Sequence, residues 1–203
     1  MIVAIVPVGR LEGAKSRLGS VLDAEERRDL AERLLTRTID VLRSIPTVSE
    51  VLVVTPDDDA RAVALAAGAR PLRQRADGLN VGIRHARDEA LAAGASAILI
   101  VPTDLPGISE PAIEPILATL TDPGPPLVTM VADRHGRGTN ALLLAPPDVI
   151  DVRFGYDSRR AHADAARGAG ARLVELSGPL ALDLDTPDDL LLAEALDPAL
   201  ARG

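Results

Sequence analysis

The amino-acid sequence predicts a three-layer α/β fold whose sheet is mainly parallel, with a small antiparallel excursion. Strand and helix patterns alternate through most of the 203 residues, which is typical of a sheet covered by helices on both faces. Several apolar runs are continuous rather than alternating, as expected for strands buried on both faces. No internal repeat or linker divides the sequence, so we expect a single domain over residues 1–203.

The first half of the chain opens with a predicted strand at residues 2–8, "IVAIVPV". A long helix is predicted over 24–44, because Asp23 is a suitable N-cap and Glu26 can close a capping box with it. Apolar residues recur along this helix at a spacing that places them on one face: Leu30, Leu34, Val41 and Ile45. The next predicted elements are a strand at 48–57, a helix at 58–69, a strand at 69–74 and a helix at 77–95.

The second half opens with a strongly apolar predicted strand, "SAILIVPTDLP", that ends in a carboxylate, and a helix that begins with Ser109 as its cap and extends to residue 122. Two strands are predicted at 126–133 and 139–147. Because a loop and no helix separates them, they form the predicted antiparallel excursion. The remaining predicted elements are a helix at 157–170, a strand at 171–176 and a helix at 186–196.

Composition excludes several classes of protein. The net charge is −8, which argues against a general nucleic-acid binder. The chain has no cysteine, so it contains no disulfide, thiolate zinc site or cysteine nucleophile. The N-terminal apolar run is too short to span a membrane and lacks a signal-peptide pattern, so we expect a soluble cytoplasmic protein. The oligomeric state stays open, a homodimer included.

Charged side chains cluster where predicted strands end. Lys15, the only lysine in the chain, and Arg17 follow the first strand. Asp104 follows the apolar run "AILIVP" at 97–102, and Asp183 and Asp185 follow the late apolar stretch. In an open parallel sheet such residues meet at one edge. Two carboxylates two residues apart in an extended segment share a face and repel unless a cation lies between them, and Mg²⁺ suits such a site. The alternative is that "DLDTPDD" only caps a helix, which explains Thr186 and the residues after it.

The loop "GRLEGAKSRLG" joins the first strand to the long helix. Its spacing does not match the G-x-x-x-x-G-K-[ST] phosphate loop, yet a glycine-containing loop in this place can hold phosphates. Lys15 would act there as a mobile point charge. The alternative is a solvated loop residue.

Two more segments combine glycine with polar and basic residues. In "DRHGRGTNALLL" the glycines permit close backbone approach to a ligand, and Thr139 opens the next strand. In "RFGYDSRRAH" Gly155 precedes a helix that begins near Asp157 or Ser158, which indicates a second anion site. An ordinary turn and an ordinary N-cap are the alternatives. The three histidines, His85, His135 and His162, lack metal-type spacing and are expected to be surface or helix residues.

Taken together, "AKSRL", "GLN" at 78–80, "VPTDLP", "DRHGRGTNALLL", "FGYDS…H" and "LDLDTPDDL" resemble, in this order, the phosphoenolpyruvate or 2-phospho-L-lactate guanylyltransferases of coenzyme F-420 (deazaflavin) biosynthesis. These belong to the molybdopterin-guanylyltransferase-like nucleotidyltransferases. The resemblance implies their three-layer Rossmann-like nucleotidyltransferase fold. It also implies a reaction in which GTP and phosphoenolpyruvate give enolpyruvoyl-2-diphospho-5′-guanosine and pyrophosphate.

The resemblance also implies roles for single residues. Phosphoenolpyruvate would contact Thr139, Gly155 and Ser158. The nucleotide would contact Lys15, Arg17 and Asn80, of which Lys15 and Arg17 would also be catalytic. Mg²⁺ would be held by Asp104, Asp183 and Asp185. The family often has a lysine where this chain has Gly9, which weakens the assignment of anion contacts in the first loop.

Three alternatives stay open at this point. The acceptor can be 2-phospho-L-lactate, or the enzyme can be another nucleotidyltransferase of the same fold that uses CTP or a different acceptor. A glycosyltransferase with a D-x-D metal site fits less well, because Asp104 would have no role. A non-catalytic nucleotide-binding module is disfavoured by the presence of Lys15 together with all three carboxylates.

Overall fold

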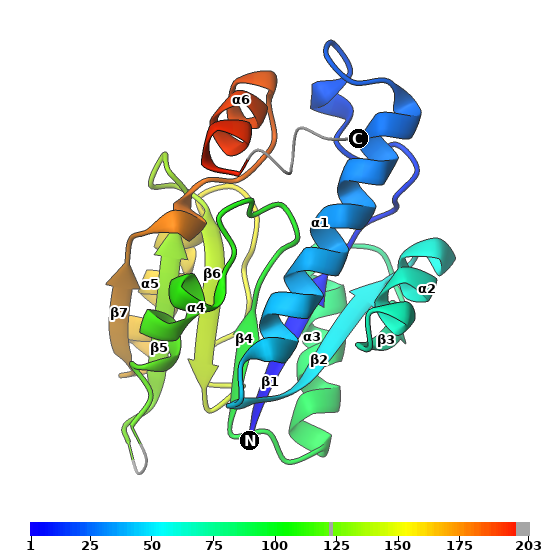
Figure 1. The fold of residues 1–203 in the computed structure, drawn as a ribbon. Coiled ribbons are helices and arrows are strands. Elements are labelled where there is room, and N and C mark those ends of the chain that lie inside the picture. Colours follow the sequence, from blue (N-terminus) through cyan, green and yellow to red (C-terminus); the bar gives the residue numbers. More distant parts are fainter. Residues whose placement is uncertain (122–123, 198–203) are drawn as a thin grey trace.

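The computed structural model describes residues 1–121 and 124–197 and contains a seven-stranded sheet with helices on both faces (Figure 1). The strands are β1 (Ile2–Pro7), β2 (Val48–Thr55), β3 (Arg70–Arg73), β4 (Ala97–Ile100), β5 (Leu127–Ala132), β6 (Thr139–Ala145) and β7 (Arg172–Leu176). The helices are α1 (Ala24–Ser44), α2 (Asp58–Ala66), α3 (Leu79–Ala92), α4 (Glu110–Leu117), α5 (Ser158–Gly168) and α6 (Pro187–Leu196), with short 3-10 turns η1 (Ser16–Leu18) and η2 (Pro179–Ala181). The predicted helical residue 122 and the last six residues of the predicted domain lie outside the described residues.

The strands lie in the order β3-β2-β1-β4-β6-β5-β7. Strand β6 is antiparallel to both of its neighbours, and every other pairing is parallel. The predicted mainly parallel sheet with an antiparallel excursion is therefore confirmed, although only β6 is reversed. The chain leaves β1 toward β2 on one side and returns to β4 on the other, so a topological switch point lies at the carboxyl ends of β1 and β4.

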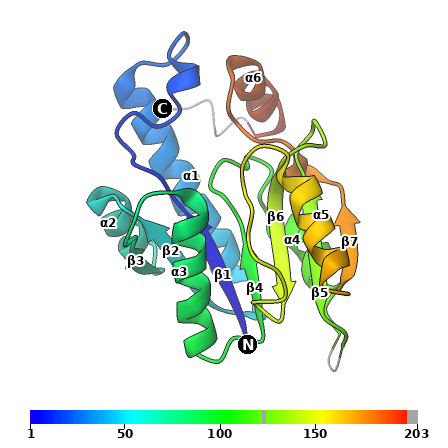
Figure 2. The same cartoon turned by 180° about the vertical axis from the view of Figure 1, so that it is seen from behind.

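Alternate residues of the strands enter two separate apolar layers. Ala4 and Val6 of β1 pack in the layer that contains the buried faces of α1, α2 and α4. Val3 and Ile5 face the opposite layer, which contains the buried faces of α3 and α5. Figures 1 and 2 show these two groups of helices in front of and behind the sheet. Because the chain has almost no aromatic residues, both layers are built from aliphatic side chains.

The long helix begins as the sequence predicts. The Asp23 side chain accepts hydrogen bonds from the backbone of Glu25 and Glu26, and the Glu26 side chain accepts one from the Asp23 N–H, which completes the capping box. Along α1, Leu30 and Leu34 are buried, whereas Val41 is half-buried. The N-terminal turn of α1 extends above the sheet, so its buried face there cannot pack on strands.

A third apolar cluster lies above the sheet edge and packs against the N-terminal part of α1. It joins the 3-10 turn η1, the start of α1, one residue of the late loop and helix α6 through Leu18, Leu30, Leu34, Leu184, Leu190 and Ala193. The loop after β1 and helix α6 thereby rise on the two sides of the same edge (Figures 1 and 2). None of the helices within 1–121 and 124–197 has both the length and the apolar character to cross a membrane.

Candidate active site

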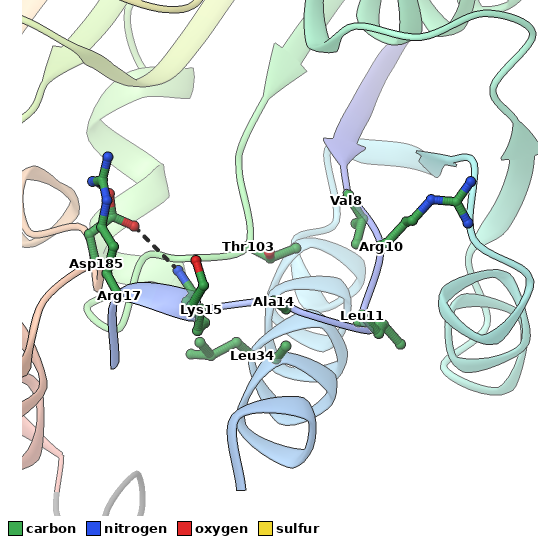
Figure 3. Close-up of a pocket in the computed structure, with 12 residues that line it drawn as sticks. Val8, Arg10, Leu11, Ala14, Lys15, Arg17, Leu34, Thr103 and Asp185 are labelled. Atoms are coloured by element: carbon green, nitrogen blue, oxygen red, sulfur yellow. Dashed lines mark hydrogen bonds and ion pairs between the residues drawn. The ribbon is translucent and has the colours of Figure 1, made fainter. Parts of the chain in front are cut away.

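Lys15 lies at the centre of the sheet edge. Its backbone adopts the left-handed conformation, with φ 53°, which costs a non-glycine residue of order 1 kcal/mol. Its side chain is only 12% exposed, and Nζ donates to the carbonyl oxygen of Leu184 at 2.7 Å. The ammonium also lies 3.5 Å from Oδ2 of Asp104 and 3.8 Å from Oδ1 of Asp185 (Figure 3 shows Lys15 facing Asp185). The only lysine is therefore not a solvated loop residue.

The backbone of Leu184 joins the two carboxylate segments. Its N–H donates to the carbonyl oxygen of Asp104 at 2.8 Å, while its own carbonyl accepts from Lys15. The Leu184 side chain is completely buried in the third cluster. Asn140 holds the preceding turn, because its Nδ2 donates to the carbonyls of Leu180 and Ala181 at 2.9 and 3.2 Å. Asp104 and the late carboxylates thus lie side by side, as the sequence predicts.

Asp183 and Asp185 do not lie on an extended strand, the arrangement considered for them from the sequence. Strand β7 ends at Leu176, and the 3-10 turn η2 intervenes before residues 182–185, which have no regular secondary structure. These carboxylates are consequently placed by loop contacts, chiefly those of Leu184, and not by strand pleating.

Asp183 is half-buried, and burial raises the pKa of its carboxyl. The charges of Asp104, Asp185 and Asp133 raise the pKa further. This carboxylate therefore lies in a negative field that a cation would relieve. Within the two described ranges no set of three or more His, Asp or Glu side chains is arranged as it stands to hold a metal ion, and Lys15 provides the positive charge between Asp104 and Asp185.

Asp189 positions Asp185. Its Oδ2 accepts hydrogen bonds from the backbone N–H of Asp185 at 3.1 Å and of Thr186 at 2.7 Å, and from the Thr186 hydroxyl at 2.8 Å. Burial acts to raise the pKa of Asp189, but the hydrogen bonds from Thr186 and Asp185 and the charge of Arg134 lower it below its usual value. The sequence explains Asp189 only as a favourable charge in the first turn of a helix, so its link to Arg134 was missed.

Two hollows meet at this edge. The first, of about 290 Å³, lies between the loop after β1 and helix α1 and includes Arg10, Leu11 and Lys15 in its lining. The second, of about 680 Å³, lies between the β5–β6 turn and the late loop and includes Asp133, Arg134 and Asp183. Arg17 and Asp185 line both hollows, and Arg17 Nη1 donates to Oδ2 of Asp185 at 3.1 Å. Two ligands bound in these hollows would meet at this pair.

The three residues expected to contact the acceptor do not themselves line the second hollow, although Tyr156, next to Gly155, does. Thr139 begins β6, next to the turn that lines the second hollow, and Ser158 begins α5 and is 2% exposed. Gly155 has φ +127° with open space at the position of a Cβ atom, so backbone conformation and not crowding requires glycine. Asp157 occupies the N-cap of α5 in the left-handed conformation, and its side chain makes no capping hydrogen bond.

Asn80 and His162 fix the segment that leads to Gly155. Both ends of the Asn80 amide bond the backbone of Phe154, with Nδ2 donating to its carbonyl and Oδ1 accepting from its N–H, each at 2.8 Å. His162, expected only to be a surface or helix residue, lies in α5 and is fully buried, and burial followed by the charge of Arg153 lowers its pKa to about 4. The nucleotide role of Asn80 stays a prediction.

Comparisons with known proteins agree with this geometry. Residues 2–194 match the family model described as "Guanylyl transferase CofC like". A phosphoenolpyruvate guanylyltransferase of Sphaerobacter thermophilus is 43% identical over 189 residues, covering 93% of this chain and 90% of the relative. One of Rubrobacter xylanophilus is 43% identical over 195 residues, covering 96% and 94%.

Solved structures support the fold. A putative nucleotide-diphospho-sugar transferase of Desulfovibrio desulfuricans superposes with a TM-score of 0.73 at 17% identity, covering 91% of this chain and 82% of that one. A nucleotidyl transferase from Methanothermobacter superposes with a TM-score of 0.67 at 18% identity, covering 100% and 98%. At these identities the likeness concerns the fold alone, and it confirms the expected nucleotidyltransferase architecture.

Proposed function

The chain belongs to the family of CofC-like guanylyl transferases, and from this premise we propose that it transfers the guanylyl group of GTP to phosphoenolpyruvate. The observation that carries the proposal is the pair of adjoining hollows that share Arg17 and Asp185, with the Lys15 ammonium at their junction. A two-substrate transfer requires two sites that open onto a common cluster of charges. The products would be enolpyruvoyl-2-diphospho-5′-guanosine, a precursor in coenzyme F-420 biosynthesis, and pyrophosphate.

The reaction balances without a general base. A phosphate oxygen of phosphoenolpyruvate, already ionised at neutral pH, attacks the α-phosphorus of GTP and forms a new P–O–P bond. The bond between the α-phosphorus and the bridging oxygen breaks, and the electron pair leaves with pyrophosphate. The protein then needs to align the two phosphates and to neutralise their charge.

The donor nucleotide is assigned to the first hollow. Lys15 and Arg17 approach it from the loop after β1, and the mainly exposed Arg17 side chain is free to turn toward phosphate oxygens. Lys15 is held by Leu184, Asp104 and Asp185 before any substrate arrives, so little reorganisation is needed to present its charge. Thr103 lines the same hollow.

The donor set at the junction fits Mg²⁺. Asp104, Asp183 and Asp185 supply hard carboxylate oxygens, and the field at Asp183 favours an added cation. Mg²⁺ usually takes one or two protein carboxylates and completes its shell with water and substrate phosphates, so a ready three-carboxylate cage is not required. When bound there, the ion would neutralise phosphate charge alongside Lys15.

The acceptor is assigned to the side formed by Thr139, Gly155 and Ser158. The hydroxyl of Thr139 is a donor suited to phosphate and carboxylate oxygens. The first two N–H groups of α5, those of Ser158 and Arg159, already donate to the carbonyl oxygens of Gly155 and Arg137. Arg134 and Arg137 line the adjoining hollow and add positive charge to a site for a trianionic acid. The positive end of the α5 dipole acts in the same direction.

The proposal is tested by incubating the protein with GTP, Mg²⁺ and either phosphoenolpyruvate or 2-phospho-L-lactate, with pyrophosphate release and mass spectrometry as readouts. We expect pyrophosphate and the guanosine diphospho-adduct with phosphoenolpyruvate, and much less product when ATP, CTP or UTP replaces GTP. Turnover with 2-phospho-L-lactate and none with phosphoenolpyruvate would overturn the proposed acceptor. Turnover with CTP and none with GTP would overturn the proposed donor.

Two further expectations accompany this function. A cytoplasmic location suits phosphorylated substrates of this kind and is tested by cell fractionation. Homodimer formation is tested by light scattering at several protein concentrations.

A further inference from the structure

We propose that His162 is a positioning residue which, through its Nδ1–H, holds the Thr139 hydroxyl as a hydrogen-bond donor toward the anionic acceptor. The inference rests on the proposed function, because it assigns a task to a side chain next to the acceptor and not in contact with it. It starts from two hydrogen bonds. Thr139 Oγ1 lies 3.0 Å from Nδ1 of His162, and the backbone N–H of Arg153 donates to Nε2 at 2.9 Å.

The second hydrogen bond determines the tautomer. A backbone N–H can only donate, so Nε2 must be the unprotonated nitrogen that accepts. In a neutral imidazole the proton then resides on Nδ1. The ring is fully buried, beside the guanidinium-bearing Arg153, and both features oppose a second proton on the ring. His162 therefore donates through Nδ1 to the hydroxyl oxygen of Thr139.

The tautomer in turn fixes the hydroxyl of Thr139. Since Oγ1 accepts from the imidazole, its own proton points elsewhere. Among the described residues this hydroxyl has no hydrogen-bond partner other than His162, and Thr139 is 6% exposed. The hydroxyl thus has one proton left to donate to an incoming phosphate or carboxylate oxygen. With the opposite tautomer, the Thr139 hydroxyl would instead donate this proton to Nδ1 of the imidazole.

His162 also couples the three residues expected to contact the acceptor. It stands one helical turn after Ser158 on α5, and it holds the Arg153 backbone two residues before Gly155. Its ring packs edge-on against Phe154, with ring centroids 5.0 Å apart, and Asn80 holds the backbone of that phenylalanine. One buried ring therefore sets the relative positions of the strand start, the glycine loop and the helix start.

Matched variants test this role kinetically. In His162→Asn the side-chain amide can place an N–H near the position of Nδ1, whereas in His162→Gln it reaches the position of Nε2. For His162→Gln we expect the KM for phosphoenolpyruvate to rise by ~10-fold or more, the size of one lost hydrogen bond to an ionised group, and the KM for GTP to change by less than about twofold. His162→Asn should recover most of this loss.

A double variant supplies the second kinetic arm. Adding His162→Gln to Thr139→Val should cost little more than Thr139→Val alone, because His162 acts through the Thr139 hydroxyl. Additive losses, equal changes in both KM values, or an Asn variant as impaired as the Gln variant would overturn the proposal. Thermal unfolding of each variant identifies any that fail to fold.

A spectroscopic arm separates this inference from the proposed function. Long-range ¹⁵N–¹H spectra of the ligand-free protein report which ring nitrogen carries the proton, and we expect Nδ1–H for His162 at pH 7. Observation of Nε2–H would overturn the inference whatever the enzyme's substrate is. Absence of wild-type turnover with phosphoenolpyruvate beside an Nδ1–H tautomer would instead overturn the proposed acceptor.

Discussion

Replacing Lys15 by methionine should separate the structural and catalytic roles of the only lysine. Methionine keeps an unbranched side chain of similar length and removes the charge. The Lys15 side chain is 12% exposed, and its ammonium lies within 4 Å of two carboxylates. A third carboxylate, Asp183, lies in the field of the same two. Its removal leaves Asp104 and Asp185 without the cation that separates them.

The size of the effect follows from the distances. At 3.5 and 3.8 Å, and with an effective dielectric constant of about 20, each ion pair has a gross Coulomb energy of roughly 4–5 kcal/mol. Desolvation of the charges cancels most of this, and Asp104 and Asp185 are 32% and 39% exposed. We therefore expect the free energy of unfolding to fall by about 1–3 kcal/mol, between the values typical of surface and buried pairs. Turnover should fall by ~10²-fold or more, as for the loss of one preorganised charge contact.

The assay combines urea unfolding with pyrophosphate release from GTP, Mg²⁺ and phosphoenolpyruvate. Arg28→Met is the matched control, since it also removes one positive charge but breaks an exposed pair with Glu32 and Asp59 on the outer face of α1. Because exposed ion pairs contribute little to stability, the control should leave both the free energy of unfolding and turnover near the wild-type values. A folded Lys15→Met protein with turnover close to that of the control would refute the role of Lys15.

Four further predictions address the surrounding residues. Asp104→Asn and Asp185→Asn should each lower Mg²⁺-dependent turnover by ~10²-fold or more without unfolding the protein, and full activity at ordinary Mg²⁺ would remove that carboxylate from the site. Asp189→Asn should weaken the hold on Asp185 and the pair with Arg134, lowering turnover by ~10-fold and unfolding free energy by about 1–3 kcal/mol in urea titrations; unchanged values would deny its positioning role. The pKa of His162 is lowered to about 4 in the folded chain, whereas the ordinary histidine pKa of about 6.5 applies in the unfolded chain. Between these pH values the unfolded chain binds a proton that the folded chain does not. The free energy of unfolding should therefore fall by up to about 3 kcal/mol as the pH is lowered from about 6.5 to about 4. Urea titrations at each pH should show a smaller fall in His162→Asn, and equal slopes would contradict the assignment. Asn80→Ala should raise the KM for the acceptor more than that for GTP, whereas the reverse order would support the nucleotide role predicted from the sequence.

Much of this architecture is readable from local sequence patterns. Three features depend on neighbouring residues only: the continuous apolar run of β1, the capping box of Asp23 and Glu26, and the Thr186 cap of α6. Ser109 also stands at the N-cap of α4, but its side chain makes no capping hydrogen bond. The convergence of Lys15 with the carboxylates also follows, because parallel strands deliver their carboxyl ends to a common edge.

Other parts of the site depend on contacts between distant segments and leave little local signal. Asp189 reads as an ordinary helix-capping residue, and only the fold shows that it receives the Asp185 N–H and faces Arg134. Asn80 lies 74 positions from Phe154, whose backbone it bonds twice. The sequence shows that Ser158 and His162 are four residues apart. Only the structure shows that His162 contacts Thr139 and thereby links Thr139 to the start of α5.

Under the proposed function, the reversed direction of β6 gives the Thr139 contact with the acceptor a different origin from the contacts with the nucleotide. Parallel strands bring residues to the shared edge at the end of each strand, after long helical crossovers that tie the nucleotide side to the whole core. Strand β6 instead presents its first residues there, directly after the short turn that follows β5. Under the proposed function, changes in this hairpin tip would alter the contact of Thr139 with the acceptor, while the loop after β1, which would hold the nucleotide, stays unchanged.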